Sequence, residues 1–275
     1  EIEVEIEGGD TPYPTWEVLR AEDREEEPQL LLLVRDAEGR LVRQVTGETG
    51  AGLHRTAWDL RLPPPDPIVL AEPEERMYWE SDPVGPLALP GQYSVQLARL
   101  VNGDLANIGM AQAFTVKPLE NSPEITDDRR ALQAFQLKAA ELQRAVKGAV
   151  GVVEEYRARI DHLQAALVET PARSAADFAT LVGLANRLED VSVALTGDVT
   201  GLSRNEPAAM PVASRVNTIY TSQALTQFPV PAQYQTSYDI AAREFSAALA
   251  ELRAIEGELE GIEGRLEGLG APWTP

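Results

Sequence analysis

The chain has 275 residues, of which 44% are hydrophobic and 25% are charged, and its formal net charge is −20. This length allows two domains, and the composition is typical of a globular protein. An acidic surface repels nucleic-acid phosphates and anionic lipids, so we expect neither as a partner. The absence of cysteine excludes disulfides and thiolate chemistry, and no apolar run reaches the ~18 residues of a membrane span.

The N-terminal segment alternates Ile2, Val4 and Ile6 with glutamates, which predicts a half-buried strand. The chain starts within this pattern and without methionine, so we expect it to be a piece of a longer protein. Residues 10–28 are rich in proline and acids, and we interpret them as a connection anchored by Trp16.

Two hairpins are predicted next. The apolar run Leu30–Val34 is typical of a strand covered on both faces, and Asp36–Gly39 has the residues of a turn. Asn102-Gly103 is the strongest hairpin signal in the chain. The four strands expected around these turns are Gln29–Arg35, Leu41–Thr46, Gln92–Val101 and Ala111–Lys117.

Between the hairpins, Gly52–Arg61 alternates with a period of two and ends at a proline run, so we predict a further strand. Its largest side chain, Trp58, is expected to anchor a core. Several short strands joined by turns indicate an antiparallel β-sandwich, to which we assign residues 1–120. Residues 62–90 are interpreted as a long proline-rich excursion from it.

Three motifs suggest a family. They are Gly-Leu-His-Arg-Thr-Ala-Trp-Asp-Leu-Arg at 52–61, Gly-Pro-Leu-Ala-Leu-Pro-Gly-Gln-Tyr-Ser-Val-Gln-Leu at 85–97, and Phe-Thr-Val-Lys-Pro at 114–118. In this order they resemble the immunoglobulin-like module that follows the β-propeller in bacterial BNR-repeat, sortilin-type "glycosyl hydrolase-like" proteins. The central motif is also similar to a hairpin of the flagellar hook-capping type of immunoglobulin-like domain. The resemblance covers residues 28–118 and implies a secreted or cell-envelope location. No Asp-box repeat is present, so any glycosidase activity of that family would belong to a propeller this chain lacks.

The second half changes to a helical period. Asn121–Glu124 has the residues of a helix start, and Pro171 should end that helix. Spacings of 3 and 4 form a heptad seam. Its members are Leu132, Phe135, Ala139, Leu142, Val146, Ala149, Val153, Tyr156, Ile160, Leu163 and Leu167.

Three more helices are predicted. Ser174 and Asp177 resemble a capping box, residues 198–210 should be a loop, and Pro211 and Pro231 should open the last two helices. The expected inward residues are Leu181, Leu184, Leu188, Val191 and Leu195, then Val216, Ile219 and Leu225, and finally Tyr234, Tyr238, Ala241, Phe245, Ala248, Leu252, Ile255, Leu259, Ile262, Leu266 and Leu269. Residues 121–275 are therefore predicted to form an antiparallel three-stranded helical bundle with one broken strand, giving an α+β protein of two domains.

The sequence gives little support for a catalytic function. His54 and His162 are the only histidines, so we expect no metal site and no cofactor. Glycoside hydrolysis needs two facing carboxylates, whereas Asp59 is interpreted as a strand-end residue. The glutamates of the last helix are expected on its solvated face; they are Glu251, Glu256, Glu258, Glu260, Glu263 and Glu267.

Tyr78 and Trp79, within the 62–90 excursion, are the candidate binding residues. Exposed aromatic rings stack on sugars or anchor a partner protein, although the loop could instead fold back and bury Trp79. We therefore expect a non-catalytic accessory or scaffolding region that packs on its own upstream propeller or on another protein. A carbohydrate-binding module is the alternative, and a glycoside hydrolase fragment is a third.

Overall fold

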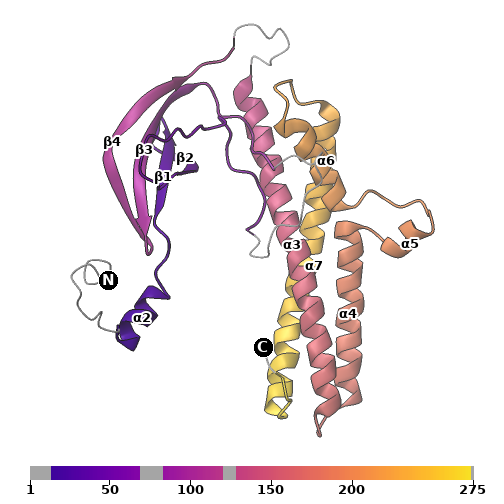
Figure 1. Ribbon diagram of the computed structural model, residues 1–275. Coiled ribbons are helices and arrows are strands. Elements are labelled where there is room, and N and C mark those ends of the chain that lie inside the picture. Colours follow the sequence, from indigo (N-terminus) through magenta and orange to yellow (C-terminus); the bar gives the residue numbers. More distant parts are fainter. Residues whose placement is uncertain (1–13, 69–82, 120–127, 274–275) are drawn as a thin grey trace. The chain divides into compact units, whose positions relative to one another are not determined.

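A computed structural model describes residues 14–68, 83–119 and 128–273 (Figure 1). The protein is α+β, with one four-stranded antiparallel sheet and six helices among these residues. Its contacts divide the chain into two compact units. The sheet unit contains residues 1–60 and 90–118, and the helical unit contains residues 61–89 and 119–275.

The sheet has the strand order β2-β1-β3-β4, and every neighbouring pair is antiparallel. Asn102 and Gly103 both have positive φ, at 49° and 83°, as a tight two-residue hairpin requires. Both predicted hairpins are confirmed, with one strand longer than expected. The strands are β1 (Gln29–Asp36), β2 (Leu41–Gly47), β3 (Gly91–Val101) and β4 (Asp104–Val116).

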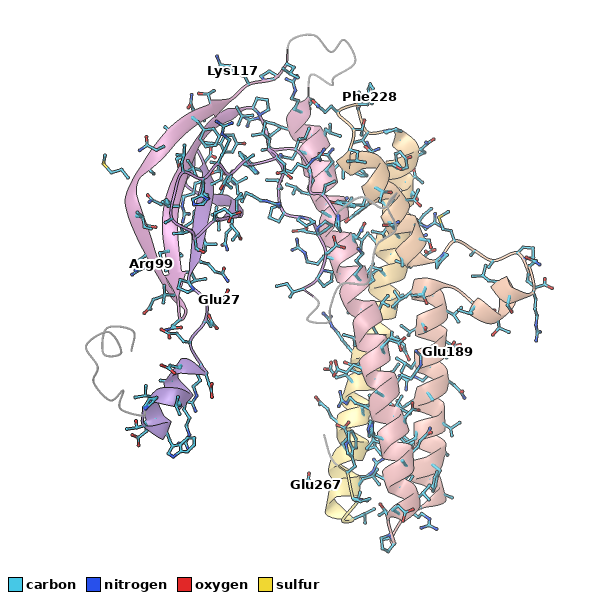
Figure 2. The ribbon with its side chains drawn as sticks, viewed as in Figure 1. Glu27, Arg99, Lys117, Glu189, Phe228 and Glu267 are labelled. Atoms are coloured by element: carbon cyan, nitrogen blue, oxygen red, sulfur yellow. The ribbon has the colours of Figure 1, made fainter. Side chains whose placement is uncertain are left out.

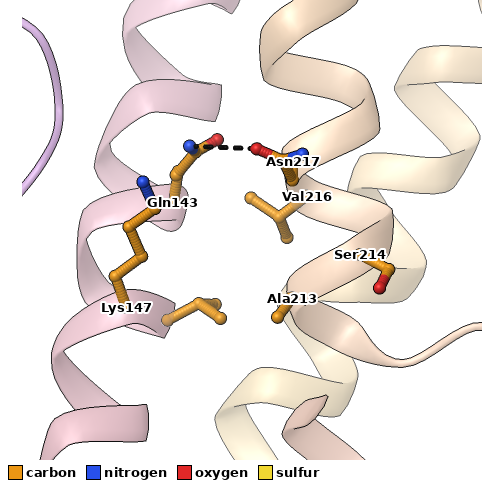
Figure 3. A pocket seen from close by; sticks show the side chains of 7 residues that line it. Gln143, Lys147, Ala213, Ser214, Val216 and Asn217 are labelled. Carbon is orange, nitrogen blue, oxygen red and sulfur yellow. Dashed lines mark hydrogen bonds between the residues drawn. The ribbon is translucent and has the colours of Figure 1, made fainter. Parts of the chain in front are cut away.

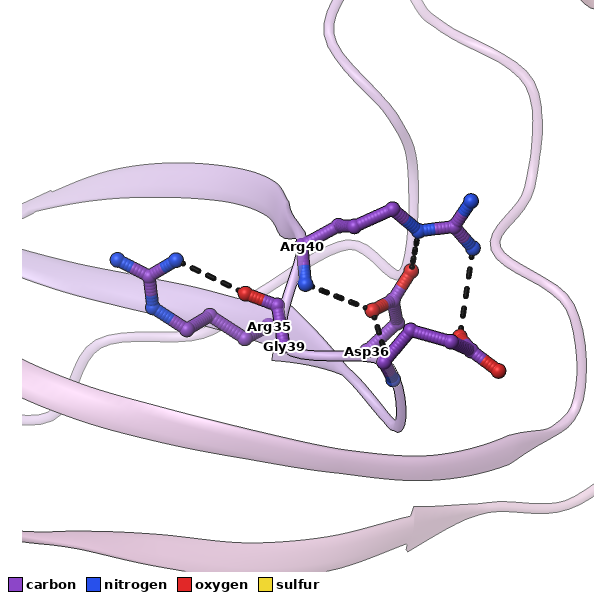
Figure 4. A network of polar contacts seen from close by, with 5 residues as sticks. Arg35, Asp36, Gly39 and Arg40 are labelled. Carbon is purple, nitrogen blue, oxygen red and sulfur yellow. Dashed lines mark hydrogen bonds and ion pairs between the residues drawn. The ribbon is translucent and has the colours of Figure 1, made fainter.

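The β1–β2 turn is organised by one carboxylate (Figure 4). Asp36 accepts hydrogen bonds from the backbone N–H groups of Glu38 and Arg40 and pairs with the Arg40 guanidinium at 2.8 Å. Desolvation alone would raise the pKa of Asp36, but the hydrogen bonds from Arg40 lower it below its ordinary value. Gly39 supplies the positive φ of 79°, so the turn is fixed by local chemistry.

The predicted strand Gly52–Arg61 is wrong. Only Arg61 of this segment forms a β-bridge, with Leu87. Leu60 adopts a positive φ of 59°, a backbone conformation that a strand cannot continue through. Trp58 is half-buried and packs edge-on against the rings of Tyr93 and Phe114, with centroids 5.5 and 6.2 Å away. The anchor role of Trp58 therefore holds without the strand.

The N-terminal connection also differs. Its described part forms α2 (Trp16–Glu22), capped by Thr15, whose side chain accepts from the Val18 N–H. The Trp16 side chain is 71% exposed, so it does not anchor the connection. The predicted strand at residues 2–6 lies outside the described residues, and the described part contains a single sheet where a sandwich needs two.

Four long helices of the helical unit share one hydrophobic core (Figure 1). α4 lies beside one end of α3 and α6 beside the other, and both contact α7. The helices are α3 (Arg129–Glu169), α4 (Ala175–Thr196), α5 (Val199–Ser203), α6 (Val212–Ala224) and α7 (Ala232–Gly268). We call the aliphatic part of this core the leucine layers; its members are Ile160, Leu163, Leu167, Leu181, Leu184, Leu188, Leu252, Ile255, Leu259 and Ile262, each at most 2% exposed.

The heptad patterns predict the buried faces well. Every seam position of α3 is buried except Phe135, which is half-buried. The Ser174 hydroxyl caps α4 by accepting from the Asp177 N–H, as its sequence indicates. The predicted start of α3 at 121–124 lies outside the described residues; the described helix begins after Asp128, whose side chain accepts from Ala131 N–H.

Three details of the helical half are corrected. Residues 198–210 are not entirely loop, because the Asp198 side chain caps the short helix α5. Leu225 follows the end of α6 and is 68% exposed, and Leu269 follows the end of α7 and is 40% exposed, where inward positions were expected. Glu263 is 8% exposed, although it was assigned to a solvated face.

The two units do not divide the chain into two contiguous pieces. The expected domains were 1–120 and 121–275, whereas residues 61–89 group with the helices. The described parts of the proline-rich excursion, residues 61–68 and 83–89, therefore belong to the helical unit by their contacts.

Candidate functional site

The predicted binding residues Tyr78 and Trp79 lie outside the described residues, so that hypothesis stays a prediction. The histidines are described. His54 bonds the Gly50 carbonyl, and His162 bonds Ala158 and stacks on Trp273 with ring centroids 4.8 Å apart. The described residues contain no group of three or more metal-ligating side chains. Asp59 is exposed.

Several carboxylates of the helical unit join helices through arginine. Arg187 of α4 pairs with Glu251 and Glu258 of α7, each at 2.6 Å. Arg157 of α3 pairs with Glu189 of α4, which Figure 2 labels. These pairs are partly exposed, and each contributes little to stability. Glu251 and Glu258 were expected to face only solvent. These pairs nevertheless place them at the contact between α4 and α7.

One ion pair is largely buried. The Arg159 guanidinium of α3 donates two hydrogen bonds to the Glu263 carboxylate of α7, at 2.9 and 2.8 Å. Nearby, burial and the Glu256 carboxylate raise the pKa of Tyr156 to about 12. A bidentate pair satisfies both charges, so the polar groups beside the leucine layers are well matched.

The ends of the 61–89 segment meet in a structure that we call the neck, formed by residues 61–62 and 84–87. The Leu62 N–H donates to the Pro86 carbonyl at 2.8 Å, and Arg61 donates to the Gly85 carbonyl at 2.8 Å. A side chain at Gly85 would overlap the Leu62 carbonyl, so only glycine permits this approach. The neck is thus a specific backbone pairing.

Side chains of α3 and α6 hold the neck. Gln133 of α3 donates to the Leu87 carbonyl at 2.8 Å, and the Tyr220 hydroxyl of α6 donates to the Val84 carbonyl. Arg61 also donates to the Ala224 carbonyl, at 3.1 Å, which satisfies one orphan acceptor at the end of α6. Burial and the charge of Asp66 raise the pKa of Tyr220 to about 12.

The contact between α3 and α6 is unusually polar. Gln136, 4% exposed, donates to the Gln223 and Thr226 carbonyls at 2.6 and 3.1 Å. The side-chain oxygens of Gln143 and Gln223 are buried and have no partner among the described residues. We call this contact the glutamine seam; its members are Gln136, Gln143, Asn217, Tyr220 and Gln223.

A cavity of about 290 Å³ opens in this seam. Figure 3 shows Gln143 and Asn217 meeting across one end of it, with Val216 and Ala213 below them. Lys147 lies on its rim and is paired with Asp66. The full lining is Gln143, Val146, Lys147, Ala213, Ser214, Val216 and Asn217.

A second hollow, of about 370 Å³, lies between α4 and α7. Its floor is made of small apolar side chains and its rim includes Asp190, Glu244 and the Arg187–Glu251 pair. Each polar group on this rim is either exposed or paired, so the groove has no buried group that needs a ligand.

Neither the neck nor the glutamine seam was predicted. The available signal for the seam was the spacing of Gln136 and Gln143, which are one heptad apart and flank the apolar positions of α3. For the neck the only signal was a glycine between valine and proline at 84–86.

Comparisons with protein-family models, with curated proteins and with solved structures each found no match. Within the described part of the chain, no helix combines the length and the apolar character needed to cross a membrane.

Proposed function

We propose that the chain is a non-catalytic accessory or scaffolding region of a larger, secreted BNR-propeller protein of the glycosyl hydrolase-like kind, where it packs on or positions the propeller. The motifs at 52–61, 85–97 and 114–118 support the family assignment by resemblance. The same resemblance supports a location outside the cell or in its envelope.

The proposal includes a finer view of the fold. The sheet would belong to an immunoglobulin-like sandwich, and the helices would form an antiparallel three-stranded bundle in which α4 and α6 together make one strand. In favour of the bundle, α4 and α6 each contact both α3 and α7. In favour of the sandwich, the four strands are antiparallel and Trp58 covers part of one face.

The observation that carries the scaffolding role is the neck. Two helices hold both of its arms through Gln133, Tyr220 and Arg61, so both ends of the excursion are fixed to the helical unit. Holding a loop at its base lowers the ordering cost of binding. A structural module that docks through this segment makes direct use of such a base.

The carbohydrate-binding module is the second candidate, because Tyr78 and Trp79 lie along the chain between the two arms of the neck. Calorimetry with cello-, xylo- and manno-oligosaccharides separates the two. The scaffold predicts weak or no binding for the parent and for Trp79→Ala. Micromolar binding that is lost in Trp79→Ala would overturn the scaffold in favour of the carbohydrate module.

The third hypothesis, a glycoside hydrolase fragment, is tested with chromogenic glycosides. We expect the chain not to hydrolyse them, and hydrolysis would contradict a non-catalytic role. The family assignment has its own test, namely whether coding sequence precedes Glu1 and contains Asp-box repeats. A different domain there would contradict the propeller part of the proposal.

A further inference from the structure

The groove between α4 and α7 has an apolar floor and an acidic rim. Its volume is about 370 Å³, and its lining includes Val191, Ala194, Ala247 and Ala248. Glu244 lies on the rim, is exposed and has no ion pair among the described residues. The floor carries no long side chain, so the groove can receive a narrow helix that brings a cation to Glu244.

The outer face of α7 continues from this groove as a run of small residues. Directly opposite the buried seam, every position from 247 to 268 is alanine or glycine, and each is exposed. Their spacing alternates between three and four residues, as in a second heptad seam. The positions are Ala247, Ala250, Ala254, Gly257, Gly261, Gly264 and Gly268.

The glycines of this face are not explained by the fold of one chain. Glycine destabilises a helix interior more than any residue except proline. Nothing lies within 4 Å of the place where a Cβ would stand at Gly257, Gly261, Gly264 or Gly268. Contacts within the chain therefore do not require glycine there, whereas a second helix that approaches closely does, since the side chains at the contact set the distance between two helices.

We propose that two copies of the chain associate through this face, with their α7 helices antiparallel and the glycine end of each helix in the groove of the other. In this register Ala254 lies opposite the partner's Gly257, and Ala247 lies opposite the partner's Gly264. Two-fold symmetry repeats each contact, as is usual in homodimers. This association does not rest on the proposed scaffolding role.

The charges beside the face fit this register. Arg253 and Glu260 flank it on one side, are exposed and have no ion pair among the described residues. In the antiparallel pair, Arg253 meets the partner's Glu260 and Glu260 meets the partner's Arg253. On the other side Glu244 meets the partner's Arg265, whose ion pair within its own chain, with Asp177, spans 3.7 Å.

Other charges oppose the association and keep it weak. Glu251 approaches the partner's Glu258, although Arg187 of the same chain pairs with both types of glutamate at 2.6 Å and so reduces their repulsion. The formal net charge of −20 also repels a second copy. We therefore expect a dissociation constant on the order of 10–100 μM.

Sedimentation equilibrium of the intact chain tests the register. Arg253→Glu and Glu260→Arg should each weaken the dimer about tenfold, because each variant places like charges opposite one another at two symmetric positions. The double variant exchanges the charges and should restore the dissociation constant of the parent. In a parallel pair Arg253 would instead face the partner's Glu258, and the double variant would stay weakened; that result would overturn the antiparallel register.

A matched control separates the local contact from the total charge. Arg144→Glu, on an exposed position of α3, changes the net charge by the same amount as Arg253→Glu and should dimerise like the parent. If the two substitutions weaken the dimer equally, the contact does not involve Arg253 and the proposal is wrong.

The variant Gly257→Gln with Gly261→Gln tests the close approach of the helices. Each glutamine has open space within one chain and is the better helix former, so in solutions dilute enough to be monomeric the variant should unfold at no lower temperature than the parent. In the dimer these side chains would hold the helices apart, and dimerisation should be lost. Dimerisation equal to that of the parent, or a parent that stays monomeric up to about 1 mM, would overturn the proposal.

Discussion

The two ends of α3 pack in opposite ways. At the leucine layers α3 meets α4 and α7 through aliphatic side chains that are almost fully buried. The one largely buried ion pair there, Arg159 with Glu263, has two short hydrogen bonds. At the glutamine seam α3 meets α6 through amides. The side-chain oxygens of Gln143 and Gln223 have no partner among the described residues, and Gln143 also lines a cavity.

The contrast concerns how much each contact contributes to stability. Close-packed aliphatic layers stabilise a helical unit. Buried amide oxygens without partners cost stability. One continuous helix therefore makes contacts of different energetic value at different positions along its length.

The largest expected effect comes from placing a charge in the leucine layers. Leu252 is 2% exposed, and Leu252→Asp should destabilise the helical unit by about 4 kcal/mol or more, because the new carboxylate is buried without a partner. Far-ultraviolet circular dichroism should show loss of helix while NMR signals of β1 and β3 stay dispersed. Ala254→Asp on the exposed face of α7 is the control and should cost less than about 0.5 kcal/mol. If Leu252→Asp and Ala254→Asp unfold at the same temperature, burial in the leucine layers does not contribute to stability.

A reciprocal exchange tests the contrast more directly. Leu163→Gln introduces an amide into the leucine layers, where the side chain is 0% exposed, and should cost about 3 kcal/mol. Gln143→Leu removes from the seam an amide whose oxygen has no partner among the described residues, and it should be neutral or stabilising by up to about 1 kcal/mol. Urea unfolding followed by the helical signal measures both. If Gln143→Leu destabilises the chain as much as Leu163→Gln does, the amide of Gln143 contributes to stability and the proposed contrast is wrong.

The smallest expected effect is on pH dependence. The pKa values of Tyr156 and Tyr220 are raised from 10.0 to about 12, the first beside the leucine layers and the second in the seam. The folded chain holds each phenolic proton more tightly than the unfolded chain does. Their contribution is therefore complete below pH 10 and is lost as the pH rises towards 12. Tyr156→Phe and Tyr220→Phe should each remove roughly 1–2 kcal/mol of this dependence in urea titrations at increasing pH. An unchanged pH profile in both variants would show that neither phenol is perturbed.

The sequence predicted the helical faces because apolar spacing reflects burial directly. Positions such as Leu163 and Leu252 follow from the 3 and 4 spacing alone. Glu263 was misplaced because its burial depends on Arg159, which lies 104 residues away. Heptad spacing fixes which face of a helix is buried, but it does not fix which residue of a neighbouring helix stands opposite.

The strand error has a similar origin. Alternation in Gly52–Arg61 describes the segment by itself, whereas a strand also needs a partner with free ladder groups. The structure gives the pairing positions beside β1 and β3 to other strands, and the backbone turns away at Leu60. The glutamine seam was not predicted because the burial of Gln136 and Gln143 depends on α6. Their own spacing along α3 does not show which helix lies opposite them.

The neck also joins parts of the chain that are far apart in the sequence. The hydrogen bond from Arg61 to Ala224 joins residues 163 positions apart, and β3, β4, α3 and α4 all lie between them in sequence. Contacts of such separation form late, because the entropy of closing a long loop must first be overcome. During synthesis the residues of the neck emerge long before α6, so their helical partners arrive only after the sheet is complete. We therefore expect the hydrogen bond from Arg61 to Ala224, which joins the neck to the end of α6, to be among the last contacts of the helical unit to form.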